Sequence, residues 1–272
     1  MCMITSISNP RIKQVVQWQT KAKERRKDKV FVVEGHKMVE EAPEHLIREI
    51  YVSSGCLERL RKQEDRDGKL LEKLSRTGYE EVSDEVFERM SDTRTPQGIL
   101  AVVRQPEYNL QEILQNCAAR KCAPLFIVLE NLQDPGNLGT ILRTGEGAGI
   151  TGVIMSASTV DIFNPKVIRS TMGSVYRVPF TYEENLLDTL KTLHGAGVKT
   201  YAAHLKGDTY YDCFSFREPT AFLIGNEGNG LSREISEVAT SYLKIPMEGQ
   251  LESLNAAVAS ALLMYEAHRQ RR

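Results

Sequence analysis

The residues of this chain that could do chemistry gather towards its C-terminal end, beside short apolar runs. An apolar run at 221–224, which predicts a buried strand, ends in the glycine-rich turn GNEGNG at 225–230. A second apolar run at 242–247 precedes the sequence SLN at 253–255, where an apolar helix begins that Ser253 is expected to cap. A flat ligand held by main-chain N–H and C=O groups requires such small residues, because larger side chains would keep the backbone at a distance.

The glycine spacing in this turn excludes two common nucleotide-binding motifs. Gly225, Gly228 and Gly230 give the pattern G-x-x-G-x-G, whereas dinucleotide-binding turns have G-x-G-x-x-G. The turn also lacks the lysine of a Walker motif. A glycine-rich turn alone is compatible with an ordinary tight loop, so the neighbouring segments must decide what it binds.

A further polar segment lies upstream, directly after another apolar run. The sequence LFIVL at 125–129 is typical of a strand buried on both faces, and ENLQDPGNLG follows it at 130–139. A helix is expected next, with Asn137 as its cap and Arg143 projecting nearly two turns further along. Arg143 is therefore expected to face whatever occupies the pocket.

Together these segments resemble the sequence motifs of the SpoU (TrmH) branch of the SPOUT RNA methyltransferases. Motif one is matched by 131–143, motif two by the glycine-rich turn, and motif three by IPM at 245–247 with ESLN at 252–255. The resemblance covers 125–272 and implies methylation of a ribose 2′-hydroxyl in RNA, with S-adenosylmethionine as cofactor. It also implies a homodimer with the active site at the subunit interface, and a deep C-terminal trefoil knot that no sequence pattern alone would reveal.

The resemblance also implies which residues serve the reaction. The residues expected to hold a bent S-adenosylmethionine are Gly225, Asn226, Gly230, Ile245, Met247 and Leu254. The residues expected to be catalytic are Asn137, Arg143, Glu227, Ser253 and Asn255. Glu227 and Asn255 are expected to hold Arg143 and the hydroxyl in place.

The role of Arg143 has two interpretations. A ribose hydroxyl is a weak nucleophile, so the site must orient it, remove its proton and align it with the methyl group. Family proposals make Arg143 the base, but an arginine side chain is almost always protonated. We favour a clamp on the adjacent phosphate that stabilises the developing alkoxide, and the role of base remains the alternative.

The bulk composition places the chain among ordinary globular proteins. Its hydrophobic content of 41% and charged content of 26% are typical of that class. No apolar stretch approaches the roughly 20 residues that a membrane helix needs, and no signal peptide is evident, so we expect a cytoplasmic protein. The scattered cysteines and histidines predict reduced thiols and no metal site.

Attraction to RNA must come from a local charge, because the net charge is only −1. A helix expected after Asn9 carries many cations and few anions on its polar positions. Such a run is ordinarily a solvated face, but this imbalance also suits contact with phosphates. The residues expected to bind substrate are Lys21, Lys23, Arg25 and Arg26. Trp18 is expected to pack this helix onto its domain, with stacking on a base as the alternative.

Alternating strand and helix patterns divide the chain into two domains. Residues 1–105 predict a small α/β/α domain that resembles the N-terminal RNA substrate-binding domain of SpoU-type enzymes. The polar stretch 106–123 is expected to be a linker. Residues 124–272 predict the catalytic domain, with a parallel six-stranded sheet and helices on both faces.

Two other functions compete with this one. A methyltransferase of the Rossmann type would have a G-x-G-x-G turn after its first strand, where this chain has ENLQDP at 130–135. A non-catalytic RNA-binding or ribosome-assembly factor on the same fold stays open, although intact motifs argue against a decayed site. Ribosomal RNA is the expected substrate and transfer RNA the alternative, because two-domain members with this front domain more often act on ribosomal RNA.

Overall fold

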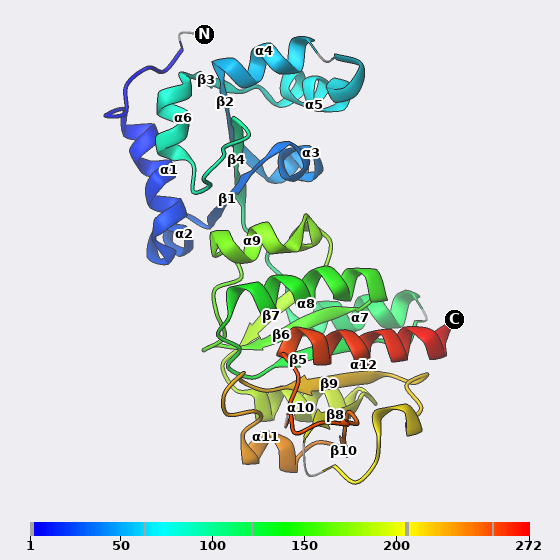
Figure 1. The fold of residues 1–272 in the computed structure, drawn as a ribbon. Helices are drawn as coiled ribbons and strands as arrows, with labels where there is room; N and C mark the ends of the chain where they lie inside the picture. Colours follow the sequence, from blue (N-terminus) through cyan, green and yellow to red (C-terminus); the bar gives the residue numbers. More distant parts are fainter. Residues whose placement is uncertain (1–2, 63, 121, 205–206, 252) are drawn as a thin grey trace. The chain divides into compact units, whose positions relative to one another are not determined.

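The computed structural model describes residues 3–62, 64–120, 122–204, 207–251 and 253–272 (Figure 1). Its chain forms two compact units. Unit 1 comprises Met1–Pro106 and Asp161–Tyr176, and unit 2 comprises Glu107–Val160 and Arg177–Arg272. Within the described residues, every helix is too short or too polar to traverse a lipid bilayer.

Unit 1 is built on a mixed four-stranded sheet in the order β1-β4-β2-β3. The strands are β1 (Val30–Glu34), β2 (Ile47–Ser53), β3 (Glu80–Val82) and β4 (Ile99–Arg104). β4 is antiparallel to both of its neighbours, and β3 is parallel to β2. Strand β3 has only 3 residues, which is too short for an alternating pattern to predict it from the sequence.

Helices cover both faces of this sheet, as the sequence predicted. One face carries α1 (Pro10–Thr20) and α6 (Asp84–Met90), whose apolar side chains join one core with the strands. The other face carries α3 (His36–Glu41), α4 (Ser54–Lys62) and α5 (Glu64–Thr77) (Figure 1). The α/β/α layering is therefore confirmed for this unit.

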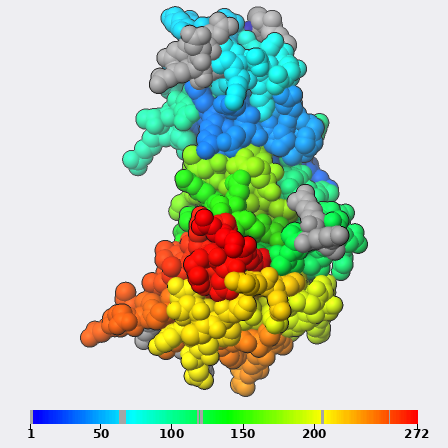
Figure 2. Space-filling view, turned by 90° about the vertical axis from the view of Figure 1, so that its right-hand side faces the viewer, coloured from blue at the N-terminus to red at the C-terminus, as the bar shows by residue number. Residues whose placement is uncertain are grey.

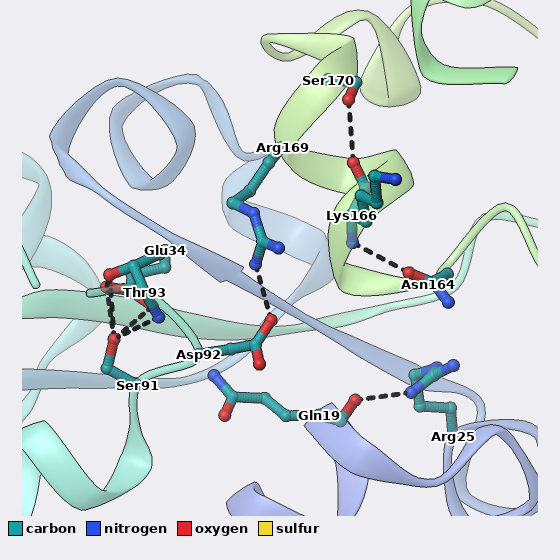
Figure 3. Close-up of polar contacts among 10 residues, drawn as sticks. All are labelled: Gln19, Arg25, Glu34, Ser91, Asp92, Thr93, Asn164, Lys166, Arg169 and Ser170. Atoms are coloured by element: carbon teal, nitrogen blue, oxygen red, sulfur yellow. Dashed lines mark hydrogen bonds and ion pairs between the residues drawn. The ribbon is translucent and has the colours of Figure 1, made fainter. Parts of the chain in front are cut away.

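Residues 161–176 pack within unit 1, although the sequence prediction placed them in the second domain. They contain α9 (Pro165–Thr171), on which Arg169 pairs with Asp92 at 2.7 Å (Figure 3). The Tyr176 hydroxyl donates to the carbonyl oxygen of Met38 at 2.9 Å. These partners are far apart in the sequence, so no local pattern could have shown where this segment packs.

Unit 2 contains an all-parallel six-stranded sheet in the order β10-β8-β9-β5-β6-β7. The strands are β5 (Leu125–Leu129), β6 (Gly152–Ser156), β7 (Phe180–Glu183), β8 (Lys199–Ala203), β9 (Thr220–Ile224) and β10 (Ser241–Leu243). Every position of β5, β6 and β9 is buried, as expected for a sheet covered on both faces. The predicted fold class is confirmed, while the trefoil knot stays a prediction.

Two groups of helices cover the sheet of unit 2 (Figure 1). On one face lie α7 (Leu110–Arg120), α10 (Leu186–Gly195) and α11 (Arg233–Glu237). On the other face α8 (Pro135–Ala148) packs against α12 (Ala256–Arg271). The stretch 106–123, expected to be a linker, thus contains a helix whose Leu110 and Ile113 belong to the core of unit 2.

Both units also contain short 3-10 helices. Those of unit 1 are η1 (Glu44–Leu46) and η2 (Ser174–Tyr176), and that of unit 2 is η3 (Tyr211–Cys213).

The far end of α12 is fastened by the side chain of Arg271. Its guanidinium group donates hydrogen bonds to backbone carbonyl oxygens of the two segments that lead into β5 and β9. The acceptors are the carbonyl oxygens of Ala123, Pro124, Phe216 and Glu218. Burial lowers the pKa of Arg271, but the carbonyl oxygens keep its donors satisfied. The C-terminal end of α12 is therefore anchored to the segments before β5 and β9.

Candidate active site

A cavity of about 380 Å³ lies where β8, β9 and β10 end. The carboxyl edge of a parallel sheet is the usual place for a ligand, because the loops that leave it meet there. The cavity is walled by the turn after β9, the segment after β10 and the start of α12. The residues expected to hold the cofactor all line it, namely Gly225, Asn226, Gly230, Ile245, Met247 and Leu254.

The glycine-rich turn after β9 closes on itself. Asn226 and Gly230 exchange two backbone hydrogen bonds, of 3.0 and 2.8 Å. The Asn226 side chain also accepts the backbone N–H of Gly228 at 2.9 Å. A Cβ atom on Gly225 would lie 2.0 Å from the carbonyl carbon of Gly230 and 2.1 Å from the nitrogen of Leu231. Glycine is therefore required at 225 because the turn crosses its own backbone, which is a reason that the sequence did not suggest.

Side chains from three separate segments meet in one hydrogen-bonded chain beside the cavity. The side-chain amide of Asn137 donates to Glu227 at 3.1 Å, and Asn255 donates to the side-chain oxygen of Asn137 at 2.9 Å. The side-chain oxygen of Asn255 in turn accepts the backbone N–H of Ala257 at the start of α12. Of these residues, Glu227 and Asn255 line the cavity, and so does Ser253. The structure thus brings together four of the five residues expected to be catalytic.

Two helix caps differ from the expectation. The N-cap of α8 is Asp134, whose side chain accepts the backbone N–H of Asn137 at 2.8 Å. The N-cap of α12 is Asn255, so Ser253 lies before the helix, in the wall of the cavity. Serine, aspartate and asparagine are all good caps, so residue type alone could not choose between neighbours. Pro135 at the first helical position was the available signal for α8.

The Glu227 carboxylate is held as an ion by the loop that leads into α8. It accepts the backbone N–H groups of Gln133 at 3.0 Å and Asp134 at 2.9 Å, besides the Asn137 side chain. Burial raises the pKa of this carboxyl group, but these donors outweigh it and hold the pKa below its ordinary value. Glu227 therefore connects the glycine-rich turn to the loop after β5. The expectation that Glu227 holds Arg143 is not met within the single chain.

Arg143 lies apart from the cavity in the single chain. It is exposed on α8 and makes no hydrogen bond or ion pair with the part of the chain that the structure describes. It shares an exposed stripe of α8 with Thr140 and Gly147. A Cβ atom on Gly147 would lie 3.0 Å from the Tyr265 hydroxyl of α12, so this stripe borders the outer face of α12.

The residues expected to bind substrate divide into two groups. Lys21, Lys23 and Arg26 are exposed around α2 (Ala22–Asp28). Arg25 is only 3% exposed, and it pairs with Asp161 at 2.7 Å. It also donates to the carbonyl oxygen of Gln19 at 3.0 Å (Figure 3). Its guanidinium group is therefore not available to a phosphate, which corrects the expectation for this residue.

Trp18 behaves as the sequence predicted, whereas two residues in the lining of the cavity were not predicted. Trp18 is buried and donates to Asp28 at 2.7 Å, so it packs α1 against α2. His204 and Lys244 line the cavity but were not predicted. They follow the ends of β8 and β10, and the rule that ligands bind at strand ends could have identified both.

Comparisons with known proteins agree with this arrangement. The sequence model of the SpoU rRNA Methylase family matches residues 124–265, and that of the MRM3-like substrate binding domain matches residues 9–101. The 23S rRNA (guanosine(2553)-2'-O)-methyltransferase RlmP of Bacillus subtilis is 37% identical over 268 residues, which cover 97% of this chain and 98% of the relative.

Solved structures with the same fold include two that contain the cofactor. An AdoMet-bound rRNA methyltransferase from Sinorhizobium meliloti has a TM-score of 0.81 at 28% identity, covering 98% of this chain and 97% of the other. The SpoU methyltransferase AviRb from Streptomyces viridochromogenes, in complex with AdoMet, has a TM-score of 0.81 at 27% identity, covering 97% and 98%. The chain therefore belongs to the SpoU rRNA methylase family.

Proposed function

We propose that this protein transfers a methyl group from S-adenosylmethionine to a ribose 2′-hydroxyl of ribosomal RNA. The observation that carries the proposal is the hydrogen-bonded chain Glu227–Asn137–Asn255, which joins three distant segments at the wall of one cavity. S-adenosylmethionine supplies an electrophilic methyl group on a sulfonium. RlmP, a relative over nearly the whole chain, is named for this reaction on 23S rRNA.

The cavity fits the cofactor in size and lining. Its volume of about 380 Å³ lies within the usual range of small-molecule sites, about 300–1,000 Å³. The self-closed glycine turn leaves backbone groups along one wall. Ile245, Met247 and Leu254 contribute apolar side chains to the other walls. A nucleoside with a flat base and a polar sugar requires this combination of apolar surface and backbone donors and acceptors.

The outer face of α12 supports the proposal that a second copy of the chain completes the site. One face of this helix is buried in unit 2 through Leu263 and Met264. The opposite face also carries large apolar side chains: Val258 is 48% exposed, Leu262 is 38% and Tyr265 is 49%. Figure 2 shows part of α12, in red, on the surface of unit 2. The part of α12 from residue 256 to residue 265 is therefore apolar on both faces, and such a helix is normally buried, which supports a partner on this face.

A homodimer packed on this face would give Arg143 its role. The exposed stripe of α8 that carries Arg143 borders the outer face of α12, as the proximity of Gly147 to Tyr265 indicates. A symmetric pair of subunits places the same surfaces against each other, so Arg143 of each chain lies beside its partner. We assign Arg143 to the active site of the partner subunit.

The residues of the site then divide the work of the reaction. The Arg143 guanidinium group binds the phosphate next to the target ribose and stabilises the developing alkoxide. The Ser253 hydroxyl, in the cavity wall, orients the ribose. Asn137 and Asn255 hold their segments in fixed positions, because each amide is already engaged with its neighbour. Deprotonation of the 2′-hydroxyl is left to solvent or another group.

Unit 1 is the proposed RNA-binding unit. Residues 1–105 are the proposed substrate-binding domain within it. Its exposed cations Lys21, Lys23 and Arg26 would contact phosphates. Replacing these three residues by alanine should lower the slope of log affinity against log salt by roughly one for each lost contact. The matched control replaces the exposed Lys191 and Arg233 of unit 2. An unchanged slope in the first variant would return these cations to an ordinary solvated surface.

The reaction itself is tested by mapping methylated riboses in total RNA from cells with and without this protein. We expect one ribose of ribosomal RNA to lose its methyl group in the absence of the protein. Purified protein should restore that group with S-adenosylmethionine. Loss of a transfer RNA methyl group instead would move the substrate to the alternative class. Unchanged methylation in both RNA classes would favour a non-catalytic RNA-binding factor.

A further inference from the structure

Asn131 occupies an unusual backbone conformation in the loop after β5. Its φ angle is +55°, in the left-handed region that residues other than glycine seldom adopt. Asparagine is one of the few side chains that tolerate this region, because its amide can form local hydrogen bonds. Asn131 does not line the cavity, and its conformation therefore needs a reason other than contact with a ligand.

The left-handed turn directs the Asn131 carbonyl oxygen towards the glycine-rich turn. This oxygen accepts the side-chain amide of Asn226 at 2.9 Å and that of Gln133 at 3.1 Å. The same Asn226 side chain closes the turn through its oxygen, which accepts the backbone N–H groups of Gly228 and Asn229. One amide group thus joins the wall of the cavity to the loop after β5.

The Asn131 side chain fixes this conformation from the other side. Its oxygen accepts the hydroxyl of Ser156 at 2.9 Å and that of Ser158. The backbone N–H of Asn131 donates to the same Ser156 hydroxyl at 2.9 Å. Ser156 is the last residue of the buried strand β6, so it provides a rigid support.

We propose that Asn131 is a positioning residue for the cofactor, acting through Asn226 on the turn that walls the cavity. The proposal rests on the function proposed above and adds a residue that touches neither cofactor nor RNA. It follows from a division of tasks between two ties. Glu227 holds the turn to residues 133–137, which include Asn137, whereas Asn131 holds the side of the turn nearest β9.

This division predicts a specific kinetic signature. Asn131→Gly keeps access to positive φ but loses the side-chain acceptor. The KM and Kd for S-adenosylmethionine should rise about tenfold, the scale expected for a net hydrogen bond or two. The kcat at saturating cofactor should stay within about twofold, because the Glu227 tie is intact. Asn131→Asp, which keeps an acceptor and tolerates positive φ, should bind nearly as wild type.

A double-mutant cycle tests whether the effect passes through Asn226. Asn226→Asp keeps the oxygen that closes the turn but loses the donor to Asn131. The double variant should bind the cofactor about as weakly as the weaker single variant. Full additivity would overturn the proposal, since Asn131 would then act elsewhere.

Two further variants keep the outcome interpretable. Ser158→Ala, at an exposed position, should raise the Kd about threefold if Asn131→Gly proves too unstable to study. Asn185→Ala, which removes the cap of α10 in the same unit, should lower thermal stability without changing the Kd. If wild type binds S-adenosylmethionine but Asn131→Gly and Ser158→Ala bind equally well, the positioning role fails. If wild type itself does not bind it, the proposed function fails first.

Discussion

The side-chain amide of Asn255 donates to the side-chain oxygen of Asn137 across 2.9 Å, although 118 positions separate the two residues. Asn255 uses its oxygen at the same time to cap α12, and Asn137 uses its amide to reach Glu227. Each asparagine therefore needs both halves of its amide. This requirement separates the role of Asn255 in the site from its role in stability.

We expect Asn255→Asp to fold normally and to transfer methyl groups at least tenfold more slowly. Aspartate keeps the capping oxygen and is favourable at a helix N-terminus. It loses the donor to Asn137 and sets two oxygen atoms against each other. Thermal unfolding and single-turnover transfer should be measured together. The control is Asn9→Asp, at the cap of α1, which should change neither quantity. Equal transfer rates in the two variants would reduce Asn255 to a helix cap.

Arg143→Ala should bind S-adenosylmethionine normally and lose methyl transfer by about a hundredfold or more, the usual scale for one preorganised charge stabiliser. Arg143→Lys should rescue little, because an ammonium group lacks the planar fork. The residual activity should still rise with pH as in wild type, whereas a role as base predicts a changed pH response. Near-normal single-turnover transfer by Arg143→Ala would make this residue an ordinary surface arginine.

The proposed position of Arg143 in the partner's site can be tested by complementation. Arg143→Ala and Asn255→Asp chains, each defective alone, should form mixed dimers that recover part of the wild-type activity. One site of such a dimer combines an intact arginine with an intact cavity. No recovery in purified mixed dimers would place Arg143 in the site of its own chain.

Leu262→Asp should convert the proposed dimer to a monomer that still binds the cofactor but transfers no methyl group. The substitution puts a charge on the outer face of α12, where burial against a partner would leave it unpaired. Analytical ultracentrifugation measures the mass, and calorimetry measures the cofactor. Val238→Asp is the control, because Val238 is 42% exposed in the same unit but lies outside α12. A Leu262→Asp dimer would contradict the assigned interface.

Gly225→Ala should weaken cofactor binding by more than tenfold, because the added Cβ atom meets the backbone of Gly230 at 2.0 Å and the turn must open. Gly228→Ala should be tolerated, since its Cβ atom would approach the Asn226 side chain no closer than 3.5 Å. Calorimetric titration of both variants makes the comparison. Equal affinity for the two would place the cofactor away from this turn.

Glu227 predicts a pH dependence of stability with a definite sign. Its pKa in the folded chain is lower than in the unfolded chain, where a glutamate has a pKa of about 4.3. The unfolded chain therefore takes up the proton first as the pH falls. The stabilisation is complete above about pH 4.3 and is lost as the pH falls through the folded pKa.

Glu227→Gln should accordingly be less stable than wild type at pH 7, and the difference should narrow below about pH 4.3. Urea unfolding of both proteins across this range measures the difference in free energy of unfolding. A difference that stays constant with pH would mean that the carboxylate charge is not what the loop after β5 recognises.

The sequence predicted the sheet of unit 2 well because its central strands are buried on both faces. Residues 125–129 and 221–224 are continuous apolar runs, which is the pattern such strands must have. Short β3 has no comparable signal, and its pairing with β2 depends on residues far away. The residues that line the cavity after β9 and β10 were also predictable, since the family motifs carry them in order.

The errors concern choices that only tertiary structure makes. Arg25 belongs to a basic run, yet it is buried by a partner 136 positions away, Asp161. Asp134 and Asn137 are both good helix caps. In the structure Asp134 caps α8, and the side chain of Asn137 is therefore available to bond Glu227 and Asn255. The role of Asn131 was equally hidden, because a left-handed asparagine looks like any other asparagine in a sequence.

The anchor of α12 at Arg271 has a consequence for the order in which the protein is made. The cavity is lined by residues within 203–259, but the far end of the helix that begins there is fastened only when Arg271 reaches the carbonyl oxygens of Ala123 and Glu218. These hydrogen bonds can form only after synthesis has passed residue 271, although the last residue that lines the cavity is Ala259. Chains that stop before Arg271 would have every residue of the cavity wall, but α12 would be held by its buried apolar side chains alone.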